Sequence, residues 1–180
     1  STRRFPRCCV PKAFGAVAER QLHAFFDGSE RAYGACVYER QVDVKGNVAT
    51  SLILSKTRVC PSAKLLTIPR TELCAATEAV RLMGVICREI DQQIHRRYFW
   101  TDSECVLRYL ANTNKRFQVF VSNRLSEIRS CSEGDSWRHV PTNLNPADRL
   151  SRGSSLDLED EFNAWIHGPE FLMKGESEWP

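Results

Sequence analysis

Hydrophobic and polar positions follow one another along this chain in a way that predicts strands first and helices later. The first long apolar stretch, LHAFFDGSERAYGACVY at residues 22–38, is interrupted by Asp27 and by the turn-forming pair Gly28-Ser29. It predicts a strand at 22–26 and a second strand at 32–39 that folds back beside it. A third strand is expected at 48–56, after a hairpin turn at 43–47. The pattern therefore predicts an antiparallel meander with Asp27 at the end of its first strand.

Beyond residue 60 the apolar positions take a helical period. Leu73, Val80 and Met83 belong to a pattern that predicts a long helix from residue 69 or 70 to about 90, with proline in its first turn. The pattern then predicts a strand at 96–100, helices at 104–110 and 117–128, a short strand at 136–140 and a helix that starts at Pro146, where Asn145 is placed to cap it. Strands alternating with helices predict an α/β protein with a mixed sheet and helices on its faces.

Composition is that of one globular domain. The chain has 180 residues, of which 42% are hydrophobic and 26% charged. No window approaches 18 uninterrupted apolar residues, and the N-terminal STRRFPRCC has no apolar signal core, so we expect a soluble intracellular protein without a membrane partner. The eight cysteines form no C-x-x-C pair, and most lie in apolar runs. We therefore expect buried free thiols in a reducing compartment rather than zinc ligands.

Charge divides the sequence unevenly. Residues 154–180 carry a net charge of −6, whereas the other 153 residues carry about +9, from 24 basic and 15 acidic side chains. An excess of that size favours a polyanionic partner, although solvated basic side chains alone produce the same balance. We expect an irregular lead-in at 1–20, a domain at 21–153, and an acidic C-terminal extension at 154–180 that becomes a linker.

Four acidic residues fall at or near the ends of the predicted elements. They are Asp27, Glu72, Asp102 and Asp148. Carboxylates brought together repel one another unless cations occupy the site. Oxygen ligands of this kind suit Mg²⁺ or Mn²⁺, and a pair of such ions is a recurring device for displacement at phosphorus. Taken singly, each acid also has an ordinary role as a turn former, helix cap, first-turn acid or exposed helical residue.

The motifs around these acids are more specific than the acids themselves. They are DGS at 27–29, IPRTELCAA at 68–76, WTDSE at 100–104 and WRHVPTNLNPADRLSRG at 137–153. Together they resemble the ribonuclease H domain of retroelement polyproteins. More narrowly, LHAFFDGSERAYGACVY, SKTRVCP, and NPADRLSRG followed by WIHGPEFL look like the BEL/Pao type. The resemblance covers about residues 5–180, and HGPEFL…WP is similar to the stretch that precedes integrase in such polyproteins.

This resemblance implies an α/β ribonuclease H-like fold, in which helices flank a five-stranded mixed sheet. The first three strands of that sheet are antiparallel. It implies an endoribonuclease that hydrolyses the RNA strand of RNA/DNA hybrids during reverse transcription and leaves 3′-hydroxyl and 5′-phosphate ends. The same four acids would hold two Mg²⁺ ions, with Mn²⁺ as a substitute and Asp27 shared by both ions. Implied partners are the hybrid and neighbouring reverse transcriptase and integrase domains, in cytoplasmic virus-like particles.

Further residues are candidates by the same resemblance. His139 lies nine residues before Asp148, near where many ribonucleases H carry a histidine that assists proton transfer or product release. A strand-end histidine that only forms a hydrogen bond explains it equally well. Backbone groups around Gly28, Ser29 and Ser103 are expected to contact 2′-hydroxyls. The basic candidates for the DNA phosphates, which solvation alone would also explain, are Arg70, Arg108, Lys115 and Arg116.

Two alternatives stay open at this point. One is a catalytically weak or inactive ribonuclease H-like module that binds nucleic acid or acts as a scaffold; the presence of all four acids favours activity instead. The other is a different nuclease or transposase of the same fold, since fold does not determine substrate. Asp148 in NPAD speaks against this second alternative, because integrases generally use a glutamate as the final acid.

Overall fold

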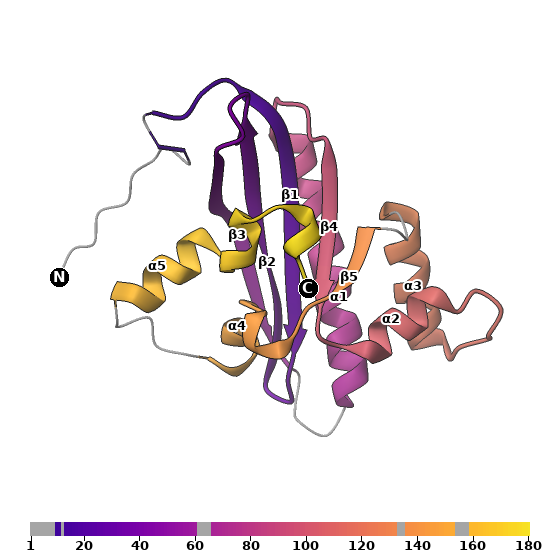
Figure 1. Cartoon of the computed structure of the whole chain (residues 1–180). Coiled ribbons are helices and arrows are strands. Elements are labelled where there is room, and N and C mark those ends of the chain that lie inside the picture. Colours follow the sequence, from indigo (N-terminus) through magenta and orange to yellow (C-terminus); the bar gives the residue numbers. More distant parts are fainter. Residues whose placement is uncertain (1–9, 12, 61–65, 133–135, 154–158) are drawn as a thin grey trace.

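A five-stranded sheet forms the centre of the computed structural model, which describes residues 10–11, 13–60, 66–132, 136–153 and 159–180 (Figure 1). The strands are β1 (Val17–Gly28), β2 (Ala32–Asp43), β3 (Val48–Val59), β4 (Arg96–Thr101) and β5 (Trp137–His139). Their order is β3-β2-β1-β4-β5. The pairs β1–β2 and β2–β3 are antiparallel, whereas β1–β4 and β4–β5 are parallel. The predicted mixed sheet, with its first three strands antiparallel, is confirmed.

Helices lie on both faces of this sheet. They are α1 (Ile68–Glu89), α2 (Glu104–Ala111), α3 (Val119–Cys131), α4 (Asp148–Arg152) and α5 (Glu159–His167), together with the short 3₁₀ helices η2 (Thr142–Leu144), η3 (Glu170–Met173) and η4 (Glu176–Glu178). Elements over the described part of the chain follow the predicted order. No helix within these residues is long and apolar enough to cross a membrane.

The first three strands are longer than their apolar patterns predict. β1 begins at Val17, so it includes the last residues of the expected lead-in at 1–20. Residues 1–9 and 12 of that lead-in lie outside the described residues. The added part of β1 is polar and pairs with the polar end of β2, for example Arg20 with Gln41. Hydrophobic periodicity misses these extensions because ladder hydrogen bonds depend on the neighbouring strand rather than on apolar side chains.

Successive residues of β1 point to opposite faces of the sheet, and each face has its own hydrophobic cluster. Leu22, Ala24 and Phe26 belong to the cluster covered by α1, α2 and α3. Phe25 belongs to the second cluster, on the other face. Because β1 is covered on both sides, its sequence is apolar in consecutive positions instead of alternating.

Residues 159–180 cover the second face of the sheet. In Figure 1 this yellow segment crosses one side of the strands, while α1 lies on the other side. Trp165, Phe171 and Trp179 are buried in the second cluster. The Tyr38 hydroxyl donates to the carbonyl of Trp165 (2.7 Å), and Arg40 Nε donates to the carbonyl of Leu172 (2.6 Å). The described part of the expected extension therefore contributes aromatic side chains to the hydrophobic core, despite its acidic composition.

The cysteines only partly match the expectation of buried thiols. All six described cysteines are free; Cys36 and Cys74 are buried, whereas Cys105 and Cys131 are exposed. The prediction of burial is wrong for these last two, which occupy exposed positions in the first turn of α2 and at the end of α3. Cys8 and Cys9 lie outside the described residues.

Candidate active site

Three of the four predicted acids line one pocket of about 460 Å³. They are Asp27, Glu72 and Asp102. The remaining lining residues are Gly28, Ser29, Glu30, Arg31, Ile68, Thr142 and Arg152. Asp148 does not line the pocket, but its Oδ1 lies 2.7 Å from Nε of Arg152, which does. The structure thus brings three acids together and connects the fourth to them through one ion pair.

Parallel pairing brings Asp27 and Asp102 to the same edge of the sheet. Phe25 of β1 pairs with Trp100 of β4. Asp27 lies two positions after Phe25, and Asp102 lies two positions after Trp100. The carboxyl ends of parallel strands are the usual place for a site in an α/β sheet, because side chains from several strands meet there.

Gly28 allows α1 to approach this edge closely. A Cβ at Gly28 would lie 2.7 Å from the backbone nitrogen of Glu72 and 2.7 Å from the carbonyl carbon of Thr71, which is closer than real Cβ contacts. The missing side chain therefore places Glu72 beside the end of β1. Gly28 serves the site through this packing, and a contact with substrate stays a prediction.

The acids influence one another electrostatically. Burial raises the pKa of Asp27, a hydrogen bond from Ser151 opposes this, and the negative charges of Asp102 and Asp148 raise it further. Burial likewise raises the pKa of Glu72, against a hydrogen bond from Ser103 and together with the charges of Asp27 and Asp102. The pocket is therefore short of positive charge when all four groups are ionised.

Each carboxylate is held by a partner of its own. The Ser151 hydroxyl donates to Asp27 Oδ2, and the Ser103 hydroxyl donates to Glu72 Oε2 at 2.5 Å. Nδ2 of Asn145 donates to Asp102 Oδ1 (3.3 Å). Asp148 Oδ1 is buried and accepts no hydrogen bond of normal geometry, although Arg152 pairs with it. These contacts orient four carboxylates that would otherwise repel one another.

The donor set fits a hard divalent cation in its chemistry. All four groups are carboxylates, which Mg²⁺ and Mn²⁺ prefer, and the buried Asp148 Oδ1 retains unused acceptor capacity. As the side chains stand, the described residues contain no group of three or more acidic, histidine or cysteine side chains arranged to hold an ion. Cation binding would therefore require these carboxylates to turn toward one another, and each has acceptor sites for an ion besides the one that its present partner uses.

Sequence reasoning missed two residues of the site, Ser151 and Arg152. Ser151 is 1% exposed and reaches Asp27, which lies 124 positions earlier in the chain. Arg152 follows Asp148 at the i, i+4 spacing of a helical ion pair, a signal that was visible in the sequence. Asn145 was predicted to cap the last helix, and its Oδ1 accepts from the N–H of Ala147 (3.1 Å), although α4 itself begins only at Asp148. Its amide also donates to the Phe26 carbonyl (3.1 Å) and to Asp102, a role that the sequence did not indicate.

His139 lies at the end of β5, where it pairs with Thr101 in the parallel ladder. Its side chain is exposed, does not line the acidic pocket, and forms no hydrogen bond with any residue in the described ranges. His139 therefore lies beside Thr101, the residue that precedes Asp102. A catalytic role for His139 stays a prediction.

The two serines expected near substrate are engaged within the protein. The Ser29 hydroxyl donates to the carbonyl of Ser151 (2.6 Å), and its backbone N–H donates to Ala32 (2.8 Å). Ser103 caps α2 by accepting from Val106, and its N–H donates to Thr101 Oγ1 (3.0 Å). Both serines therefore build the site, and their contacts with 2′-hydroxyls stay a prediction.

The four basic candidates lie apart from the acids. Lys115 and Arg116 line a separate cavity of about 500 Å³ beside α3. Arg70 donates to Gln118 (2.8 Å), and its guanidinium lies over the ring of Phe120. Arg108 is exposed and pairs with Glu104. None of the four lines the acidic pocket, so the structure brings only two of them together.

A sheet of this order, flanked by helices and with acids gathered at one edge, defines a ribonuclease H-like domain. Residues 1–103, more than half of the chain, match the family model of the Pao retrotransposon-like RNaseH-like domain. The chain belongs to this family. Asp27, Glu72 and Asp102 lie within the matched residues, whereas Asp148 lies beyond them. A comparison with curated proteins finds no match.

Several solved structures are similar to the chain. RNase H1 from the halophilic archaeon Halobacterium salinarum NRC-1 has a TM-score of 0.49 at 22% identity, over 73% of this chain and 95% of that one. LC11-RNase H1 in complex with an RNA/DNA hybrid has a TM-score of 0.48 at 14% identity, over 76% and 96%. Prototype foamy virus protease-reverse transcriptase has a TM-score of 0.43 at 15% identity, over 87% of this chain and 23% of that one.

Proposed function

We propose that the chain is a metal-dependent endoribonuclease that hydrolyses the RNA strand of RNA/DNA hybrids during reverse transcription of a retroelement. The convergence of Asp27, Glu72 and Asp102 on one pocket of a Pao-family domain carries this proposal. In the reaction, a water oxygen bonds to phosphorus while the bond from phosphorus to the 3′ oxygen breaks. The products are a 3′-hydroxyl and a 5′-phosphate.

The four acids would hold two Mg²⁺ ions, for which Mn²⁺ is a plausible substitute. Bound there, the ions supply the positive charge that makes water a better nucleophile and stabilises the departing oxygen. The protein contributes the orientation of the carboxylates. Ser151 and Ser103 hold Asp27 and Glu72, whose pKa values are raised mainly by burial and further by neighbouring acids. Positive charge in the pocket favours their ionised forms.

We propose that the cavity beside α3 receives phosphates of the DNA strand. Lys115, Arg116 and Arg129 line it, and the cationic side chains supply the sequence-independent attraction on which nucleic-acid binding rests. The adjoining reverse transcriptase and integrase domains of a cytoplasmic polyprotein particle are the proposed protein partners.

Cleavage of a labelled RNA/DNA hybrid tests the proposed function. The wild-type domain is incubated with hybrid, duplex RNA and duplex DNA, each with Mg²⁺, with Mn²⁺ and with chelator. We expect cutting of the hybrid RNA strand only, and only with metal. Asp102→Asn should reduce cutting to the level of the chelated wild type, because it removes a carboxylate of the pocket.

Asp91→Asn is the matched control, since Asp91 is an exposed aspartate outside the pocket and its loss changes the net charge equally. Full activity of Asp102→Asn, or no hybrid cutting with either metal, contradicts the proposal. Hybrid binding without cleavage supports the alternative of an inactive binding module.

A further inference from the structure

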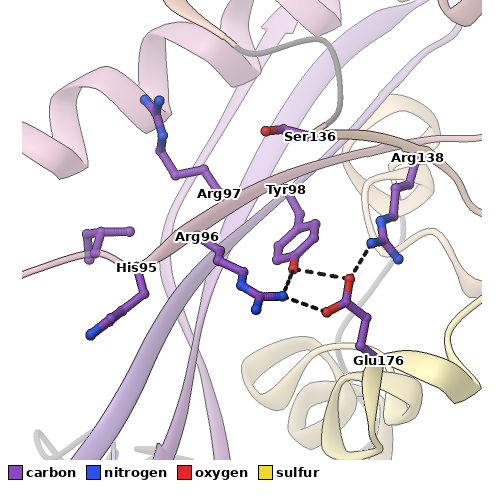
Figure 2. Close-up of a pocket in the computed structure, with 8 residues that line it drawn as sticks. His95, Arg96, Arg97, Tyr98, Ser136, Arg138 and Glu176 are labelled. Atoms are coloured by element: carbon purple, nitrogen blue, oxygen red, sulfur yellow. Dashed lines mark hydrogen bonds and ion pairs between the residues drawn. The ribbon is translucent and has the colours of Figure 1, made fainter.

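A basic pocket lies at the end of the sheet opposite the acids. It measures about 510 Å³, and His95, Arg96, Arg97, Tyr98 and Arg138 line it together with Glu176 (Figure 2). Arg96 is the first residue of β4, whereas Asp102 follows the last. At a strand rise of about 3.3 Å per residue, the two residues are on the order of 20 Å apart. Arg138 lies nearer, because it pairs with Trp100, but the two pockets share no lining residue and are therefore separate.

One carboxylate joins the cations of this pocket. Arg96 Nη1 lies 2.8 Å from Glu176 Oε2, and Arg138 Nη2 contacts Glu176 Oε1. The Tyr98 hydroxyl donates to Glu176 Oε1 at 3.3 Å. Figure 2 shows these three groups converging on Glu176. Glu19 Oε1 also lies 3.4 Å from Nε of Arg96. Nη1 of Arg96, by contrast, donates to Tyr98 and Glu176.

Arg138 is held in place more firmly than the acid, whereas the Arg96 side chain is 55% exposed. Arg138 comes from β5, and its guanidinium lies over the rings of Tyr98 and Trp100, with centroid distances of 5.1 and 5.9 Å. Glu176 comes from the three-residue turn η4, and its side chain is 37% exposed. The donors belong to the sheet, so the acid is the part of this arrangement that can be replaced.

A phosphodiester matches what Glu176 presents to these donors. Like a carboxylate, it carries one negative charge on two equivalent oxygens, and two guanidiniums that each bind one oxygen can bind either group. The pocket offers polar and cationic walls rather than apolar ones that would anchor peptide side chains. Arg97 also lines the pocket, but its side chain points away from Glu176, toward the opposite face of the sheet (Figure 2).

We propose that Arg96, Arg138 and Tyr98 form a second phosphate-binding site, which Glu176 occupies in the free domain. Its ligand is a phosphate of a nucleic-acid backbone, and the C-terminal turn competes with that phosphate. The source of the phosphate rests on the proposed function, because hybrid binding at the active site brings nucleic acid to the domain. The site itself takes no part in cleavage.

The dependence of hybrid binding on salt tests this proposal. Anisotropy of a labelled hybrid is measured with chelator, between 50 mM and 200 mM salt, for wild type, Glu176→Gln and Glu178→Gln. One added phosphate contact steepens the slope of log Kd against log salt by about 0.7–0.9. Glu176→Gln should therefore lose an extra factor of about three in affinity over that range.

Glu178→Gln is the matched control, because Glu178 is an exposed acid on the same turn and its replacement removes the same charge. Adding Arg138→Gln to Glu176→Gln should restore the wild-type slope. Equal slopes for the two single variants overturn the proposal, provided that both melt at the same temperature as wild type.

Competition distinguishes the sources of the anion. A single-stranded oligonucleotide should displace the labelled hybrid from Glu176→Gln at a lower concentration than inorganic phosphate does, when both competitors are counted in phosphate groups. Equal competition by inorganic phosphate, or stronger competition by an acidic peptide, overturns the assignment to nucleic acid. These measurements need no catalysis. A difference in slope between Glu176→Gln and Glu178→Gln without hybrid cleavage refutes only the proposed function. Hybrid cleavage with equal slopes refutes only the second site.

Discussion

At the scale of single residues, Ser151 shows how the site is controlled. It is buried, and its hydroxyl donates to Asp27 while also lying 3.1 Å from the carbonyl of Asp148. A hydrogen bond to a carboxylate favours the ionised form, and Ser151 thereby opposes the burial that raises the pKa of Asp27. The serine is a positioning residue, because it acts through the aspartate.

We expect Ser151→Ala to reduce hybrid cleavage most at low pH. Without the hydroxyl the pKa of Asp27 rises further, so a larger fraction of Asp27 is protonated at a given pH. Loss of a hydrogen bond to a charged group, about 1.5 kcal/mol or more, corresponds to an upward shift of about one pH unit, so the loss approaches tenfold on the acid limb and is smaller above it. A pH–rate profile measures it, and the acid limb should move to higher pH.

Ser130→Ala is the control, since the Ser130 hydroxyl donates to a backbone carbonyl on the exposed side of α3. A uniform loss of activity at every pH would show that Ser151 acts only through folding.

At the scale of elements, the C-terminal segment is an essential layer of the domain. Trp179 packs edge-on against His23, Tyr98 and Trp100. Gly168, with φ of +77°, passes so close to Tyr38 that a Cβ would lie 2.9 Å from its ring. A segment rich in acids therefore reaches the sheet through a few aromatic anchors and one glycine.

We expect Trp179→Ala to lower the free energy of unfolding by about 3 kcal/mol, the lower end of the range for removing a buried Trp side chain. Chemical denaturation followed by circular dichroism measures it. Val119→Ala, at a position that is 75% exposed, is the control and should change little. Equal stability of the two variants would mean that the segment contributes nothing to the core.

At the scale of the whole molecule, charge of one sign gathers at one end of the sheet. Asp27 and Glu72 have raised pKa values in the folded domain, so the folded state binds their protons more tightly than the unfolded chain does. Their stabilising effect is present at acid pH and is lost as pH rises through the folded pKa values. The metal-free domain therefore carries an electrostatic cost at neutral and alkaline pH.

We expect Asp27→Asn without metal to melt about 2–4 °C above wild type at pH 8, the shift that about 1 kcal/mol produces in a domain of this size. The difference should shrink at pH 4. Added Mg²⁺ should raise the melting temperature of wild type and leave that of the variant nearly unchanged, because binding to the folded state alone stabilises it. Thermal melts at both pH values measure these effects, with Asp91→Asn as the control.

A metal-free variant that is less stable than wild type at pH 8 would contradict this electrostatic account. It would show that the hydrogen bond from Ser151 outweighs burial and the neighbouring charges at Asp27.

Much of the domain is determined by the sequence alone. Apolar periodicity predicts the type and order of the described strands and of the helices up to α3, because side-chain spacing of two or 3.6 residues is a local property. The same patterns place Asp27 and Asp102 after strands and Glu72 near the start of a helix, and the surrounding motifs agree with the family. Local propensity also places Pro69 at the start of α1.

Contacts between residues far apart in the sequence were decided only by the tertiary structure. Ser151 and Asp27 are 124 positions apart, and Arg40 and Leu172 are 132. No periodicity carries such information, because these pairs form only after the sheet has brought separate elements together. For the same reason, composition predicted an acidic extension that becomes a linker, and only the structure shows how aromatic packing and the pairing of Glu176 with two arginines hold the described C-terminal residues on the sheet.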